Sequence, residues 1–211
     1  MLLLQQSNLQ AAENIYNNLI NEGTNNPISY CNLAAIYWIQ GKSLETIKLL
    51  NKALTIKPDY PEALYNLGLT FQAQEEFDQA INCYQKAIRL KPNYPEALIN
   101  LGASLKEQGN LDDAITAYEQ ALTFKPHSPE ACSNLGNALK LQGKIEPAIA
   151  AYEKALYLSP NYAEALSNLG TALQEIGNIE GAIAAHNKAL GLNKGLANAH
   201  KDLLTAKWLS G

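Results

Sequence analysis

Apolar residues recur at intervals of three and four along most of this chain, which is the period of an amphipathic α-helix. Leu64, Leu67 and Phe71 form one such stripe. Ala114, Tyr118 and Ala121 form another. Proline and glycine separate the stripes into segments of roughly three or four turns. The pattern therefore predicts an all-α chain built from many short helices.

The helical pattern repeats at a fixed period of about 34 residues, a length typical of helical repeat units. The segments YPEALYNLG, YPEALINLG, SPEACSNLG and YAEALSNLG begin at positions 60, 94, 128 and 162, and a weaker copy, NPISYCNLA, begins at position 26. A period of this length indicates a stacked array of repeats rather than two separate domains. We divide the chain into an N-terminal partial repeat (1–26), five full units (27–60, 61–94, 95–128, 129–162 and 163–196) and a C-terminal half-repeat helix (197–211).

Each unit is predicted to hold two helices. Proline opens the first helix, where its missing N–H costs nothing, and glycine ends that helix. Asn110 and Asn178 are candidate N-caps for second helices, which Lys-Pro or Ser-Pro pairs then terminate. The residues that mark the remaining boundaries are Pro61, Pro95, Pro129, Gly41, Gly109, Gly143, Gly177, Pro58, Pro92, Pro126 and Pro160.

Four glycines lie inside predicted first helices at one register: Gly68, Gly102, Gly136 and Gly170. Glycine costs about 1 kcal/mol relative to alanine in a helix interior. Four such costs at one position predict a close approach between the two helices of a unit. We expect the alanine column (Ala80, Ala114, Ala148, Ala182) to face that contact and the tyrosine column (Tyr84, Tyr118, Tyr152) to fill the remaining space.

The combination L-G-x-x-apolar, A-x-x-x-Y, A and P within each repeat unit resembles the tetratricopeptide repeat family over nearly the whole chain. The first unit departs from the pattern, with Ala34, Thr46 and Leu50 for the glycine, alanine and aromatic residue, and the fifth has His186 for the aromatic residue. The resemblance implies a right-handed α-solenoid of antiparallel helix pairs whose first helices line a concave face. It also implies a binding module rather than an enzyme.

Composition narrows the classes of partner. The 211 residues carry a formal net charge of -4, so the basic surplus of a nucleic-acid-binding protein is missing. No apolar run approaches the length that a membrane span requires, and the apolar start Met1–Leu4 stops at Gln5, so neither a membrane span nor a signal segment is expected. The cysteines, Cys31, Cys83 and Cys132, are few and widely spread, which suits a reducing compartment. We expect a cytoplasmic protein.

No motif for catalysis stands out. His127, His186 and His200 lie in unrelated contexts, and no cysteine or histidine pair has the spacing of metal ligands. The glycines at the shared register lie one full repeat apart and inside helices, unlike those of a phosphate-binding loop. We therefore expect no catalytic residues, no metal and no cofactor.

Asparagine recurs at the sixth position of every unit, as Asn32, Asn66, Asn100, Asn134 and Asn168, and Asp202 holds that place in the last half unit. The resemblance implies that this column faces the concave groove. A carboxamide can pair with both groups of a peptide bond. Helices stacked about 8–10 Å apart would meet an extended chain about every third residue. O-GlcNAc transferases are similar in having an asparagine ladder that holds extended polypeptides. Asparagine is also common here in ordinary repeats, and that alternative stays open.

Groove neighbours complete the expected peptide-binding site. Lysine and arginine are absent from the positions that clamp carboxylate tails in some members of the family, so that partner class is not expected. The candidate groove residues beside the asparagine column are Tyr65, Gln72, Lys106, Asn137, Lys140, Thr171 and Gln174.

Three alternative functions are consistent with the sequence. The first is a scaffold whose groove binds a protein or extended peptide. The second is the substrate-recognition arm of a larger glycosyltransferase of the O-GlcNAc transferase type. The third is a self-assembly module. The chain starts and stops within repeat units, and the apolar residues Leu203, Leu204 and Trp208 near its end predict weak self-association through the terminal helices.

Overall fold

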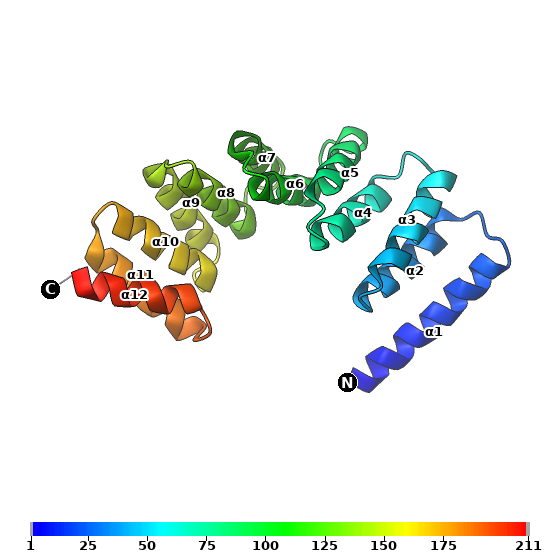
Figure 1. Ribbon diagram of the computed structural model, residues 1–211, viewed down its shortest axis with the longest axis horizontal. Coiled ribbons are helices and arrows are strands. Elements are labelled where there is room, and N and C mark those ends of the chain that lie inside the picture. The colour runs from blue at the N-terminus through cyan, green and yellow to red at the C-terminus, as the bar shows by residue number, and fades with distance from the viewer. Residues whose placement is uncertain (1, 210–211) are drawn as a thin grey trace. The chain divides into compact units, whose positions relative to one another are not determined.

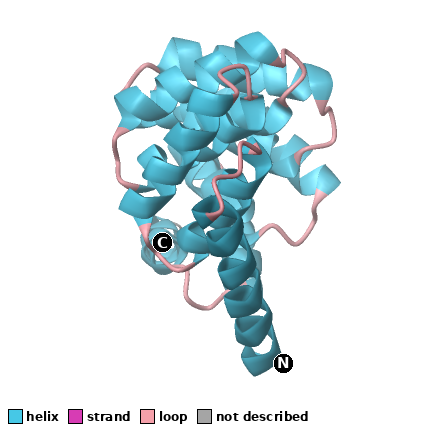
Figure 2. Cartoon of the chain, turned by 90° about the vertical axis from the view of Figure 1, so that its right-hand side faces the viewer, coloured by secondary structure: helices cyan, strands magenta, loops and turns pink. Residues whose placement is uncertain are grey.

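The computed structural model describes residues 2–209, which form twelve α-helices and no strand (Figure 2). The chain divides into two compact units, Met1–Ser104 and Leu105–Gly211. In each unit, helices that follow one another in sequence pack as antiparallel pairs, and a second helix also packs against the first helix of the next repeat. The protein is therefore an all-α solenoid, as the repeat period predicts.

The first unit holds the partial repeat and the first two full repeats (Figure 1). The helices of the first unit are α1 (Leu2–Asn21), α2 (Pro27–Ile39), α3 (Ser43–Ile56), α4 (Pro61–Ala73), α5 (Phe77–Leu90) and α6 (Pro95–Glu107). The boundary between the two units falls within α6.

The second unit continues the same alternation of 14-residue and 13-residue helices. Its helices are α7 (Leu111–Phe124), α8 (Pro129–Leu141), α9 (Ile145–Leu158), α10 (Ala163–Glu175), α11 (Ile179–Leu192) and α12 (Ala197–Leu209). Every predicted proline boundary agrees with these ranges, since α3, α5, α7 and α9 end just before the Lys-Pro or Ser-Pro pairs.

The turns between paired helices require a left-handed residue. Gly41, Gly109, Gly143 and Gly177 have φ between 73° and 81°, which glycine adopts without strain. Glu75 holds the equivalent place after α4 with φ of 60°. Of the two predicted caps, Asn178 accepts a hydrogen bond from the Gly181 N–H at 3.0 Å, whereas the Asn110 side chain makes no capping bond.

The intrahelical glycines accommodate aromatic rings. A Cβ built at Gly68 would lie 2.6 Å from Cε1 of Tyr84, and one at Gly136 would lie 2.6 Å from Cε1 of Tyr152. Both tyrosines are fully buried. The second helix thus inserts its tyrosine ring against the bare backbone of the first helix. The alanine column is buried as expected, but the contact that requires glycine at these positions is the one with the tyrosine ring.

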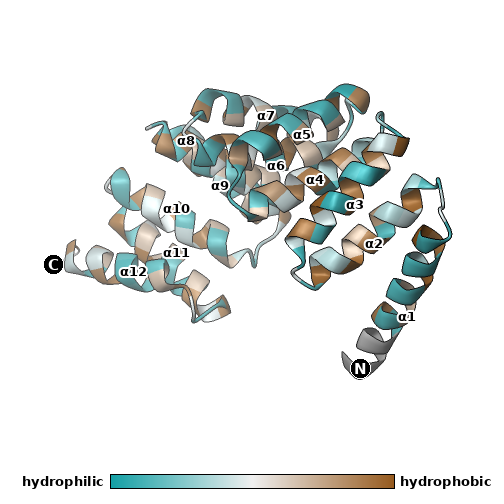
Figure 3. Ribbon diagram, turned by 45° about the vertical axis from the view of Figure 1, so that its right-hand side comes forward, coloured by the Kyte–Doolittle hydropathy of each residue, from teal (hydrophilic) through white to brown (hydrophobic). Residues whose placement is uncertain are grey.

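Apolar stripes build the core of each unit, and Figure 3 shows hydrophobic and hydrophilic residues sharing each helix. One cluster in the first unit joins residues of α2, α3, α4 and α5, including Tyr30, Leu50 and Leu67. A cluster in the second unit joins Ala148, Tyr152 and Ala172. Each cluster connects neighbouring repeats, so no repeat buries its apolar face alone.

The N-terminal partial repeat is helical and packs against the first full repeat. It is one continuous helix, α1, over Leu2–Asn21. Tyr16 and Glu13 on this helix bond to Asn32 and Gln40 of the next repeat. The predicted apolar side chains of Met1–Leu4 lie outside the residues whose side chains the structure describes.

Candidate functional site

A polar groove occurs on the first-helix face of the second unit. It has a volume of about 560 Å³ and is lined by α8, α10, α12 and the turn before α12. Five of the predicted groove residues lie together in it: Asn134, Asn137, Lys140, Asn168 and Thr171. We call this cavity the unit-2 groove. First helices supply its walls because the first helices of successive repeats, α8, α10 and α12, stack side by side.

Hydrogen bonds hold four of the polar side chains that line the unit-2 groove in place: Asn137, Asn168, Thr171 and Asp202. The Asn137 carboxamide oxygen accepts from the Tyr152 hydroxyl at 2.8 Å and from Asn168 Nδ2 at 2.9 Å. Thr171 donates to Asp202 Oδ2 at 3.0 Å. These bonds connect α8 to α10 and α10 to α12, so they also tie successive repeats together.

Asn134 is the member of the asparagine column that keeps a free carboxamide in this groove. It is half-buried, and its carboxamide makes no hydrogen bond to any residue that the structure describes. A carboxamide in this position offers two donors and one acceptor to a ligand. The groove lining also carries both signs of charge, since it includes the basic residue Lys140 and the acidic residues Glu164 and Asp202.

In the first unit the asparagine column is divided in the same way. Asn32 donates to the Tyr16 hydroxyl at 2.8 Å, and Asn100 donates to the Tyr65 hydroxyl at 3.0 Å. Asn66 makes no side-chain hydrogen bond within residues 2–209, although its backbone oxygen accepts from Thr70. The column therefore has two roles. Asn100 and Asn168 join neighbouring first helices and Asn32 joins α2 to α1, whereas Asn66 and Asn134 keep free carboxamides.

The remaining predicted groove residues are engaged within the chain or lie apart. Tyr65 accepts from Asn100, and its ring lies 5.1 Å from that of Tyr94. Gln72 accepts from the Tyr84 hydroxyl at 2.6 Å. Lys106 pairs with Glu107 at 2.6 Å, and Gln174 is half-buried outside the groove lining.

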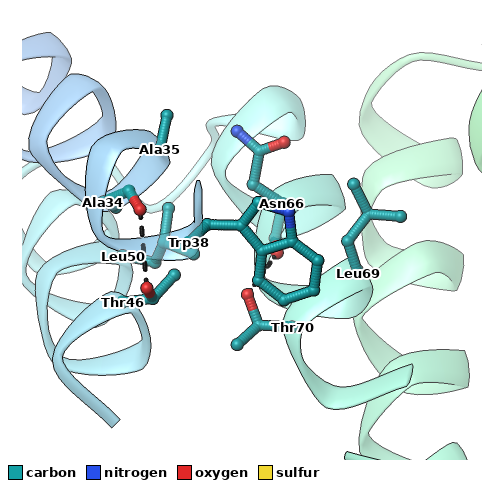
Figure 4. Close-up of a pocket in the computed structure, with 8 residues that line it drawn as sticks. All are labelled: Ala34, Ala35, Trp38, Thr46, Leu50, Asn66, Leu69 and Thr70. Carbon is teal, nitrogen blue, oxygen red and sulfur yellow. Dashed lines mark hydrogen bonds between the residues drawn. The ribbon is translucent and has the colours of Figure 1, made fainter. Parts of the chain in front are cut away.

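A second, smaller cavity lies in the first unit, where sequence reasoning named only Asn66. Its lining consists of Ala34, Ala35, Trp38, Thr46, Leu50, Asn66, Leu69 and Thr70. We call it the unit-1 pocket; its volume is about 70 Å³. In Figure 4 the Trp38 indole extends from α2 toward Asn66 and Thr70 on α4. The first unit's departure from the tyrosine pattern at Leu50 was the sequence signal for this cavity.

The thiols of Cys31 and Cys83 and the imidazole of His186 are buried at separate places in the fold. Burial raises the pKa of Cys31 and of Cys83 to about 11, so both thiols stay protonated at neutral pH and are poor nucleophiles. His186 is fully buried, neither ring nitrogen has a hydrogen-bond partner, and burial lowers its pKa. Among the described residues no group of three His, Cys, Asp or Glu side chains could hold a metal ion.

None of the described helices combines the length and apolar character needed to cross a bilayer. No curated protein gives a significant match to this sequence.

Comparison with family models agrees with the fold and the repeat period. Segments 39–75, 69–109, 103–143 and 136–177 match a model described as TPR repeat, and 163–195 matches one described as tetratricopeptide repeat. The matches run over most of the chain. The chain belongs to the tetratricopeptide repeat family, whose members are typically non-catalytic scaffolds for protein interaction.

Solved structures share the fold at low sequence identity. The APC/C assembly of Cut9 and Hcn1 aligns with a TM-score of 0.78 and 22% identity over 96% of this chain, which spans 40% of the matched chain. YrrB, a TPR protein with an unusual peptide-binding site, aligns at 0.74 and 22% over 92% of this chain and 97% of its own. MamA from Desulfovibrio magneticus RS-1 aligns at 0.75 and 22% over 82% and 97%.

Proposed function

We propose that this protein is a non-catalytic interaction scaffold and that the unit-2 groove holds a partner polypeptide in extended conformation. The observation that carries the proposal is the free carboxamide of Asn134 in an open polar groove of about 560 Å³. A peptide bond supplies one donor and one acceptor, which a carboxamide can pair at the same time. YrrB, which shares the fold, has a peptide-binding site, and this likeness supports the proposal.

The hydrogen bonds among Asn137, Asn168 and Tyr152 strengthen the argument for a groove that is formed before a ligand arrives. Side chains that are already fixed lose little conformational entropy on binding. The acceptor of Asn168 remains available while its Nδ2 is used within the chain. Backbone pairing of this kind selects an extended conformation rather than a particular sequence.

The test compares Asn134→Ala with Asn187→Ala, an exposed asparagine on α11 of the same unit. An array of random peptides about twelve residues long, which span about 40 Å when extended, identifies a binder that is then labelled for fluorescence anisotropy. We expect Asn134→Ala to raise its Kd about two- to tenfold through loss of one or two hydrogen bonds. The control should bind like wild type, and the melting temperature of both should stay within about 2 °C.

An unchanged Kd in Asn134→Ala, or no binder on the array, would overturn the proposal. Asn100→Ala provides a second contrast, because its carboxamide already bonds to Tyr65 and its loss should lower the melting temperature instead. The recognition arm of a larger glycosyltransferase would use the same groove, and the coding sequence after residue 211 distinguishes it from a free scaffold.

A further inference from the structure

The unit-1 pocket exists because the first full repeat lacks the tyrosine that the next repeats insert between their helices. In those repeats the ring reaches through to the first-helix face, where the Tyr84 hydroxyl bonds to Gln72 and the Tyr152 hydroxyl bonds to Asn137. Leu50 holds the equivalent position on α3 and is shorter than a phenol. A space therefore remains beyond Leu50 at the first-helix face.

The walls of the pocket are apolar in effect. The Thr46 hydroxyl donates to the Lys42 backbone oxygen at 2.8 Å. The Thr70 hydroxyl donates to the Asn66 backbone oxygen at 2.9 Å, a bond drawn in Figure 4. Since both hydroxyls are used, they offer a ligand little hydrogen bonding. The rest of the lining is apolar except for Asn66: Ala34, Ala35, Leu50, Leu69 and the Trp38 indole.

The size of the pocket limits its occupant. A cavity of about 150 Å³ holds benzene, and one water needs roughly 10–15 Å³. The unit-1 pocket, at about 70 Å³, is therefore too small for a whole aromatic ring and large enough for the branched end of a Leu, Ile or Val side chain. It is open at one side, so the backbone that carries such a side chain can remain outside.

Charge points to the same kind of ligand. None of the residues that line the pocket is charged. Helix α2 has no charged residue, and the charged residues of α3 and α4 lie outside the lining: Glu45, Lys48, Lys52 and Glu62. A charged side chain would lose hydration in this pocket and gain no ion pair. At the rim, the free Asn66 carboxamide is placed to pair with a peptide bond.

We propose that the unit-1 pocket binds one branched aliphatic side chain of an uncharged, extended polypeptide segment whose backbone pairs with Asn66. This proposal rests on the proposed function and adds a side-chain preference to it. The pocket gives the first unit a specificity that backbone pairing alone does not provide.

The experiment uses the full chain and an array binder whose Kd rises in Asn66→Ala; the absence of such a binder overturns the pocket proposal. Host peptides based on it are otherwise identical and carry Gly, Val, Leu, Ile, Phe, Asp or Lys at one guest position scanned along the host. We expect a register at which Val, Leu and Ile bind about five- to tenfold tighter than Gly, with Phe, Asp and Lys no better than Gly. A Trp208→Phe background leaves Trp38 as the one tryptophan. Its emission should shift to shorter wavelength with the Leu guest and stay in place with the Gly guest.

Two pocket-filling variants test the location. Ala35→Leu blocks the mouth from an exposed position, and Ala184→Leu on α11 is the matched control. The triple variant Ala34→Gly, Thr46→Ala, Leu50→Tyr rebuilds the glycine, alanine and tyrosine that the second repeat packs with success. Both fillings should remove the aliphatic preference and leave the affinity of the Gly-guest peptide unchanged.

The outcomes separate the two proposals. If aliphatic guests gain nothing while Asn134→Ala still weakens binding, the pocket proposal fails and the proposed function stands. A preference that survives both fillings, or a preference for Phe, Asp or Lys, also overturns the pocket. If no host peptide binds at all, the proposed function fails and the pocket proposal fails with it.

Discussion

Glu75 carries a backbone strain that the other repeats avoid. Its φ of 60° lies in the left-handed region, and Gly41, Gly109, Gly143 and Gly177 occupy the same place in their units. We expect Glu75→Gly to stabilise the protein by about 0.5–1 kcal/mol, because relief of the side-chain clash exceeds the entropic cost of glycine. Thermal melting should rise by about 1–4 °C.

Glu75→Ala provides the control for that prediction, since it removes the same charge and keeps a Cβ at positive φ. It should give none of the stabilisation. An equal rise in both variants would assign the effect to the charge of Glu75 instead of its backbone conformation.

Gly136 lies against the ring of Tyr152. The Cβ of an alanine there would lie 2.6 Å from Cε1 of Tyr152, which is fully buried and bonded to Asn137. We expect Gly136→Ala to cost about 1–3 kcal/mol of the free energy of unfolding, although alanine is the better helix former by about 1 kcal/mol. Denaturant unfolding measures the change.

The first repeat indicates how that cost can be relieved, because it pairs Ala34 with Leu50 at these two positions. Adding Tyr152→Leu to Gly136→Ala should recover part of the loss, giving a favourable coupling in a double-mutant cycle. Additive costs would mean that the ring is not what excludes the alanine.

At the scale of helices, the sequence predicts the boundaries well because they depend on local chemistry. Proline, glycine and the Lys-Pro pairs act through the backbone of their own turn, and the helix ranges follow them. Asn110 holds the N-cap position of α7 as predicted, but its side chain makes no capping hydrogen bond, and its Nδ2 donates to Gln108. The bonds from Asn100 to Tyr65 and from Asn168 to Asn137 depend on the register between neighbouring first helices, which the repeat pattern alone does not give.

On helix α11, His186 stands at the position that tyrosine holds in the preceding repeats. The His186 ring packs on Gly170, with a hypothetical Cβ there 2.7 Å from its Cε1, and neither ring nitrogen is hydrogen-bonded. Burial lowers the pKa of His186, and Asp202 partly opposes the shift. The folded protein therefore holds this histidine neutral at a pH at which the unfolded chain protonates it.

Stability should consequently fall as the pH drops below about 6.5, because only the unfolded state takes up this proton. His186→Phe, which cannot titrate and keeps an aromatic ring, should flatten the decline between about pH 6.5 and 5 in denaturant unfolding. His200→Phe, at an exposed histidine of α12, is the matched control and should leave the slope as in wild type. A slope that is the same in both variants would contradict the assignment to His186.

At the scale of the molecule, the two units offer different chemistry on the same face of their first helices. The unit-1 pocket is uncharged and apolar, whereas the unit-2 groove combines carboxamides with Lys140, Glu164 and Asp202. The asparagine column predicts the polar part, since it recurs in every unit. The pocket arises where one unit departs from the repeat, so a consensus reading of the sequence passes over it.

Helix α12 leaves an apolar face in water. Leu204 and Trp208 are 71% and 80% exposed, whereas Leu203, predicted to share that face, is buried with Ala199 and Ala206. Leu204 also holds the position of the intrahelical glycines, so a helix bearing the usual tyrosine would not fit there in the normal register. A surface of this kind favours contact with another apolar surface of different shape, including a second copy of the chain.

We therefore predict weak self-association through Leu204 and Trp208, with a Kd on the order of a millimolar, because the small apolar area barely exceeds the entropic cost of association. In sedimentation velocity, the average sedimentation coefficient of the wild type should increase with protein concentration. Leu204→Glu with Trp208→Glu should abolish it without loss of helix content, since both side chains are exposed. Tyr157→Glu with Leu192→Glu adds the same charge at other exposed apolar residues and should leave the association intact. A wild-type chain that stays monomeric at millimolar concentration would exclude this contact.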